Sequence, residues 1–198
     1  MLVIPESLKG KFFVYGLRTR DEKCVNLFDD YIGVCYPDGS TKQWAGTTKP
    51  GLHYLQDPIN TGGTAILVAM GDVPNTNYGI YENVYKIALH QNKYEALCQR
   101  GNLAVFRDVD KDTNYDYDIT KIEVGSLFGV NIHHAGVDSA HVDNWSAGCQ
   151  VFKVLTEFNE FLSIVKAQNL KSYTYVLQNI PKFTVDDLKI DTNVLNKF

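Results

Sequence analysis

Cys149 is the residue of this sequence that is best suited to nucleophilic chemistry. It follows Ser146, Ala147 and Gly148, and it lies 16 positions after His133. A thiol beside a histidine can attack a carbonyl carbon, and the histidine can then protonate the departing group. A glycine before the thiol lets a substrate approach the backbone and leaves N–H groups free to face a developing oxyanion. We therefore expect Cys149 and Gly148 to be catalytic, together with one of the two adjacent histidines, His133 or His134.

One helix and one strand must position these residues. Apolar side chains recur at spacings of three and four from Val151 to Val165, which predicts a helix over about residues 150–169. Cys149 would then precede a helix N-terminus, whose dipole lowers the pKa of a thiol. Residues 128–133 are expected to form a strand. Because side chains alternate along a strand, only one of His133 and His134 can face Cys149, and the pattern leaves open which.

The remaining pattern favours short strands separated by turns. Strands are expected at residues 11–17, 26–28, 31–36, 65–70, 84–90, 103–107 and 173–177. Residues 94–99 fit a helical turn, and residues 52–55 follow a turn. These elements predict a mainly β (α+β) fold with one domain over residues 1–180, followed by a tail, 181–198, of uncertain order.

Composition excludes several classes of protein. The chain has 198 residues, a formal charge of −4, 44% hydrophobic and 21% charged residues, which is typical of one globular domain. The acidic balance argues against a nucleic-acid partner, and the longest apolar run, residues 65–70, is too short to span a membrane. Pro5, Glu6 and Lys9 interrupt any secretory signal, so we expect synthesis in the cytoplasm without a signal peptide, and free thiols.

The residues around His133 and Cys149 resemble a known catalytic motif. Ile-His, a gap and then Ser-x-Gly-Cys is similar to the motif of the YkuD-type L,D-transpeptidases, and residues 47–51 resemble that family's Thr-Pro-x-Gly segment. The closer resemblance is to phage and prophage proteins with an Asn-Ile-His stretch and a Ser-x-Gly-Cys-Gln motif. Those also carry Ala-Leu-x-Gln, here residues 96–99, and an Arg-Asp pair, here Arg107 and Asp108. The similarity runs discontinuously over residues 47–152.

The resemblance implies a fold and a set of roles. It implies a YkuD-like β-sandwich or open barrel with one main helix after the catalytic cysteine. Cys149 would be the nucleophile and His133 the base, with the Gly148 and Cys149 amides as oxyanion donors. The expected substrate-binding residues are His134, His90, Ser146, Trp145 and Arg107. The chain departs from the family where Ala-Gly replaces His-Gly before the cysteine and Gln150-Val151 follows it.

The function expected from this resemblance is a cysteine-dependent peptidase of peptidoglycan stem peptides, of phage or prophage type. It would act as an L,D-carboxypeptidase, endopeptidase or L,D-transpeptidase-like enzyme through a Cys149 acyl-enzyme, without an organic cofactor. It would reach the cell wall after release through a separate holin-type pore, as an endolysin does, or as part of a virion. The alternative is a catalytically inactive virion structural or wall-binding module on the same scaffold. A third possibility is the same chemistry on another amide.

Two metal sites are also conceivable. Asp108, Asp110, Asp112 and Asn114 place oxygen atoms at every second position, as in a calcium loop, although an EF-hand glycine is missing. A solvated acidic loop explains the same pattern. His133, His134, His141 and Cys149 could supply zinc ligands, but their spacing matches no familiar zinc signature.

Overall fold

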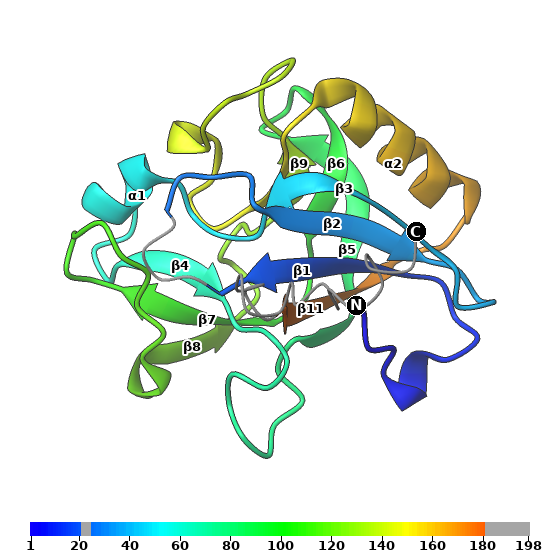
Figure 1. Cartoon of the computed structure of the whole chain (residues 1–198), viewed down its shortest axis with the longest axis horizontal. Coiled ribbons are helices and arrows are strands. Elements are labelled where there is room, and N and C mark those ends of the chain that lie inside the picture. Colours follow the sequence, from blue (N-terminus) through cyan, green and yellow to red (C-terminus); the bar gives the residue numbers. More distant parts are fainter. Residues whose placement is uncertain (21–24, 181–198) are drawn as a thin grey trace, which may run out of the picture.

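A closed β-barrel forms most of the computed structural model, which describes residues 1–20 and 25–180 (Figure 1). The expected tail, 181–198, therefore lies outside the described residues. Within the described part, hydrogen bonding around the barrel follows the order β1 (Phe13–Thr19), β11 (Tyr173–Ile180), β5 (Ile80–His90), β6 (Tyr94–Gln99), β9 (Ile132–His134), β10 (Gln150–Phe152), β3 (Thr41–Thr47) and β2 (Asp30–Cys35), which returns to β1.

A smaller sheet lies beside one end of the barrel. It has the order β4 (Thr64–Leu67), β7 (Leu103–Asp108) and β8 (Ile122–Gly125), and Figure 1 shows it on the side away from the main helix, α2 (Leu155–Ala167). The short helix α1 (Leu52–Gln56) lies near β4, and the 3₁₀ turns are η1 (Glu6–Leu8), η2 (Ile119–Lys121) and η3 (Asp143–Trp145). No helix of the described residues is long and apolar enough to cross a bilayer.

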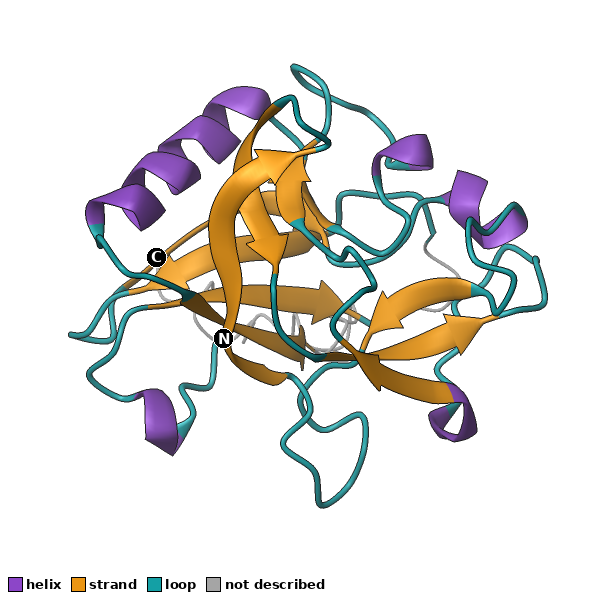
Figure 2. Ribbon diagram, turned by 180° about the vertical axis from the view of Figure 1, so that it is seen from behind, coloured by secondary structure: helices purple, strands orange, loops and turns teal. Residues whose placement is uncertain are grey.

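Helix α2 covers one side of the barrel with an apolar face (Figure 2). Phe158, Phe161, Leu162 and Val165 are buried, at the three-and-four spacing of an amphipathic helix. The Phe161 ring lies 4.7 Å from the ring of Phe152 in β10, measured between centroids. Burial of each such side chain contributes about 1.5–3 kcal/mol, so this face fixes α2 against the strand that follows Cys149.

The mainly β class and the main helix after Cys149 are confirmed, but several details of the expected fold are wrong. The sheet closes on itself and is neither a sandwich nor an open barrel. Residues 94–99 form strand β6 instead of a helical turn, and residues 52–55, for which no element was predicted, belong to helix α1. Residues 26–28 lie outside the strands of the described residues, because Asn26 has φ +67°, and strand β9 begins at Ile132, four residues later than expected. The main helix begins at Leu155, five residues later than expected, because residues 150–152 pair as a strand with β9 and β3.

The parallel pairing of β9 with β10 brings the two halves of the sequence motif together. Gln150 is paired with Ile132, and Val151 with His133. Continuing this register by one residue places Cys149 beside Asn131. The loop between the two strands carries η3 and the turn that ends at Cys149.

Candidate active site

Cys149, His133 and His90 line one cavity of about 270 Å³. They come from three places: the turn before β10, strand β9 and the end of β5. Trp145, which is 41% exposed, lines the same cavity. Four of the expected site residues, one of them the exposed aromatic side chain of Trp145, thus meet at one opening in the surface.

The Cys149 thiol is half-buried and held by backbone groups. The Asn131 N–H donates to Sγ at 3.3 Å, and the thiol donates to the Gly129 carbonyl at 3.4 Å. Burial raises the pKa of the thiol to about 11, and the Asn131 N–H offsets this only in part. The expected lowering of the pKa is wrong, because Cys149 directly precedes strand β10, and the main helix α2 begins only at Leu155.

The His133 imidazole is buried and neutral. Its Nδ1 lies 2.8 Å from the His134 carbonyl oxygen, which can only accept, so Nδ1 carries the proton and Nε2 keeps its lone pair. The Tyr94 hydroxyl is farther from Nδ1, at 3.4 Å. Burial, followed by the neighbouring His90, lowers the pKa of His133 to about 3. Within the described residues, no hydrogen bond joins His133 to Cys149, so the base shares the cavity with the thiol without contacting it in this resting state.

Gly148 and Ser146 build the turn that presents the thiol. Gly148 has φ +123°, and a Cβ there would lie 2.5 Å from the Ala65 carbonyl oxygen, so only glycine fits. The Gly148 N–H donates to Ser146 Oγ at 3.2 Å, and that hydroxyl donates to the Cys149 carbonyl at 2.8 Å. The Gly148 amide is therefore already bonded and does not supply the expected free oxyanion donor. Ser146 is fully buried in the turn, which corrects its expected contact with substrate.

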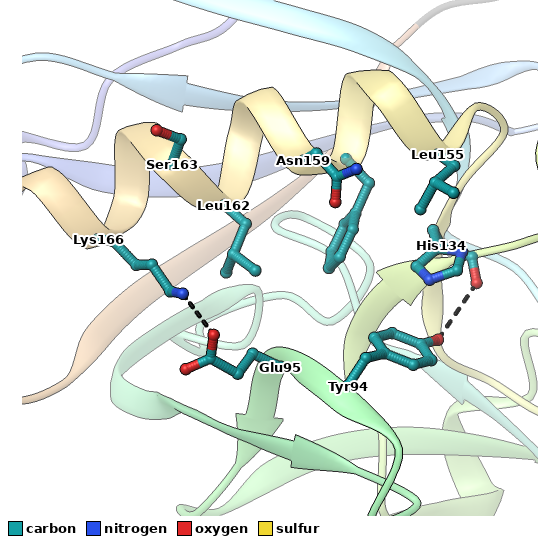
Figure 3. Close-up of a pocket in the computed structure, with 9 residues that line it drawn as sticks. Tyr94, Glu95, His134, Leu155, Asn159, Leu162, Ser163 and Lys166 are labelled. Atoms are coloured by element: carbon teal, nitrogen blue, oxygen red, sulfur yellow. Dashed lines mark hydrogen bonds and ion pairs between the residues drawn. The ribbon is translucent and has the colours of Figure 1, made fainter.

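His134 faces the opposite side of β9. It lines a separate cavity of about 480 Å³ between β6 and α2 (Figure 3). Its ring centroid is 4.3 Å from that of Tyr94 and 5.2 Å from that of Phe158. His134, expected to bind substrate, therefore lies outside the Cys149 cavity, and His133 is the histidine that shares that cavity.

Arg107 lies one cavity away from Cys149. It lines an adjoining cavity of about 250 Å³, which shares Ile59, Phe128 and Ala147 with the Cys149 cavity. Its guanidinium pairs with Glu123 at 2.8 Å and donates to the Gly63 carbonyl at 3.1 Å. Arg107 can therefore contact only the part of a substrate that extends beyond the thiol.

Asn131 is a site residue to which the sequence analysis assigned no role. Besides the backbone contact to Cys149, its side-chain Oδ1 accepts from the Gln99 N–H at 2.9 Å, and its Nδ2 lies 3.1 Å from His90 Nδ1. The available signal was its place in the Asn-Ile-His stretch, directly before the strand that carries His133. Asn131 connects the thiol to His90.

The residues expected to bind metal are used otherwise. The Asp112 carboxylate accepts from the backbone and side chain of Asn114, and Asp110 accepts from the Asp112 N–H. Asp108 is buried, accepts from the Asp116 N–H at 3.0 Å, and has its pKa raised to about 6, chiefly by burial. In the described part of the chain, no three His, Cys, Asp or Glu residues are grouped to hold a metal ion. The arrangement thus gives the calcium loop no support.

The four residues considered as zinc ligands also do not lie together. His134 lies on the other side of β9 from Cys149, and His141 is exposed in the following loop. Only His133 and Cys149 of that set share a cavity.

Comparison of the chain with family models, with curated proteins and with solved structures found no match.

Proposed function

We propose that this protein is a cysteine peptidase that cleaves an amide bond in peptidoglycan stem peptides through a Cys149 acyl-enzyme, with water as the acceptor. The observation that carries the proposal is the shared cavity of Cys149 and His133, in which the Nε2 lone pair of His133 is free to take a proton. The motif resemblance described above supports the choice of stem peptides as the substrate class.

The structure favours general-base chemistry over a preformed ion pair. The thiol and the imidazole are both neutral at rest, because burial raises the pKa of one and lowers the pKa of the other. As Sγ bonds to the carbonyl carbon, the thiol proton passes to His133 Nε2. His133 then gives that proton to the amine nitrogen as the C–N bond breaks, which leaves a thioester on Cys149. Water attacks the thioester and releases a carboxylic acid and the thiol.

The shape of the site fits a peptide that continues beyond the thiol. The cavity that contains Arg107 adjoins the Cys149 cavity along Ile59 and Phe128, so an extended chain can occupy both. A stem peptide is such an extended chain. The proposal places the protein at the cell wall, after release through a membrane pore or on a virion.

Digestion of purified sacculi tests the proposal. Wild-type protein should release muropeptide fragments with new peptide ends, and Cys149→Ala should release none above background. Cys35→Ala is the matched control, because it removes a buried thiol that does not line the Cys149 cavity. Equal release by wild type and Cys149→Ala, or none by either, would overturn the proposal.

A second candidate function is a wall-binding or virion structural module without turnover. The observation in its favour is that Cys149 has a raised pKa and donates to Gly129, with no hydrogen bond to His133 among the described residues. This candidate is favoured if wild-type protein sediments with sacculi and releases no fragments.

A further inference from the structure

We propose that His90 is a second catalytic residue of this site, which donates a hydrogen bond from Nε2 to the carbonyl oxygen of the bound substrate and to the oxyanion that forms on it. This inference rests on the proposed function and adds an electrophilic partner to the Cys149 thiol and the His133 base. It also assigns Asn131 as the positioning residue that sets the tautomer of His90.

The tautomer of His90 follows from a backbone group that can only donate. The Gln99 N–H lies 2.9 Å from Asn131 Oδ1, so this atom of the amide must be the oxygen. The other end of the amide is then an NH₂ group, and it lies 3.1 Å from His90 Nδ1. Nδ1 must therefore accept, and in a neutral ring the proton is on Nε2.

The tautomer of His133 is fixed in the opposite sense by a group that can only accept. The His134 carbonyl takes the Nδ1 proton of His133 at 2.8 Å, which leaves a lone pair on Nε2. The same cavity thus presents one imidazole that accepts a proton and one that donates a hydrogen bond. Within the described residues, neither Nε2 atom has a hydrogen-bond partner, so both are available to a ligand.

Backbone geometry at Cys149 leaves room for such a donor. The Gly148 N–H is occupied by Ser146 Oγ, and the Cys149 N–H is unbonded among the described residues. An oxyanion formed on a carbonyl bonded to Sγ would therefore have one free backbone donor. An oxyanion site of this kind commonly uses two donors, and His90 supplies the second from across the cavity.

The stack of the two histidines keeps His90 in its donating, neutral form. When His133 gains the thiol proton, its positive charge lies one ring spacing from His90, 4.3 Å between centroids. A second positive charge at that distance is strongly disfavoured. His90 therefore donates without releasing its proton, while His133 carries the proton that moves.

Two probes of Cys149 separate this role from a structural one. Acetylation by p-nitrophenyl acetate forms an oxyanion: the S–C bond forms, p-nitrophenolate leaves, and the thiol proton goes to His133. Alkylation by iodoacetamide displaces iodide and forms no oxyanion. We expect His90→Ala and Asn131→Asp to slow acetylation by roughly 10²-fold. Alkylation should change by less than about threefold in His90→Ala and by less than about tenfold in Asn131→Asp, whose carboxylate disfavours the nearby thiolate.

Matched variants complete the test. Asp at position 131 accepts where the amide donated, so in the neutral ring of His90 the proton moves to Nδ1 and Nε2 loses it, without loss of either ring. Both probes are used at alkaline pH, where the ring is neutral. His90→Gln, whose amide can donate, should stay within about tenfold of wild type in acetylation. Asn144→Ala, an exposed residue of the same cavity, should match wild type with both probes. Thermal melting of each variant verifies that it is folded.

The outcomes separate this inference from the proposed function. If wild-type Cys149 is acetylated and His90→Ala and Asn131→Asp are as fast, or lose both reactions equally, the role of His90 is overturned while the nucleophile stands. If wild-type Cys149 is alkylated but never acetylated, the proposed function is overturned and this inference with it.

Discussion

The rings of His90 and His133 lie face to face, with centroids 4.3 Å apart and planes inclined by 17°. Both rings are buried, and the pKa of each is lowered, by burial first and by neighbouring histidines next. A stack of two imidazoles can hold one added proton far more readily than two. The site is therefore uncharged at rest and is built to carry a single proton during a reaction.

The raised pKa of Cys149 predicts an alkaline profile for its alkylation. Because the thiolate is the reacting form, the iodoacetamide rate should rise about tenfold per pH unit through the neutral and alkaline range, toward the pKa of about 11. Cys149 should still be labelled before Cys35 and Cys98, which are only 1% and 3% exposed. Peptide mass spectrometry at a series of pH values measures this. A rate that levels off below neutral pH would instead show a preformed thiolate–imidazolium pair.

The lowered pKa of His133 predicts a loss of stability in mild acid. Between the ordinary value of 6.5 and the folded-state value of about 3, the unfolded chain binds a proton that the folded chain excludes, so stability falls as the pH drops below 6.5. His133 should account for about 2 kcal/mol of the unfolding free energy lost between pH 7 and pH 5.

Urea denaturation of His133→Gln at the two pH values measures that share. The variant should lose about 2 kcal/mol less than wild type over the interval. His141→Gln, which replaces an exposed histidine, should keep the wild-type difference. An equal pH dependence in His133→Gln and wild type would contradict the burial of a neutral ring.

The cost of a side chain in the turn before Cys149 can be measured by comparing Gly148 with Gly71, a glycine elsewhere in the chain. Both have positive φ, +123° and +85°, but only Gly148 has a backbone oxygen in the way of a Cβ, at 2.5 Å, while nothing lies within 4 Å of that position at Gly71. Gly71→Ala should cost about 1 kcal/mol from the backbone conformation alone. Gly148→Ala should cost roughly 2–4 kcal/mol, because the turn must also move away from Ala65. Thermal melting compares the two, and equal losses would contradict the close approach.

The sequence allowed the class of fold to be predicted better than the borders of its elements. Alternating apolar runs located most strands, and the period of residues 151–165 located the main helix. The helix start was misplaced because Val151 fits the helical spacing, yet it lies in a strand paired with Thr47. A partner 104 positions away in sequence leaves no local signal. Closure of the barrel depends on the same kind of distant pairing, between β1 and β11.

For the site, spacing singled out Cys149 but left His133 and His134 open as its partner. The motif resemblance favoured His133, and the structure places Cys149 and His133 in one cavity. Spacing and motif did not predict which ring nitrogen of each histidine carries the proton. The positions of the His90 and His133 protons depend on the Gln99 N–H and the His134 carbonyl. Main-chain groups of this kind are present at nearly every residue, so their role appears only when the fold brings them to a particular ring.

Strand β9 is only three residues long, and its two histidines are divided between separate cavities. A shift of β9 by a single residue along β10 would exchange the environments of these two side chains. His134 would then enter the cavity that contains Cys149, and His133 would move to the cavity beside α2. The register between β9 and β10 therefore determines which histidine acts as the base. A substitution that shifts this register would abolish the activity and leave the fold and every reactive side chain in place.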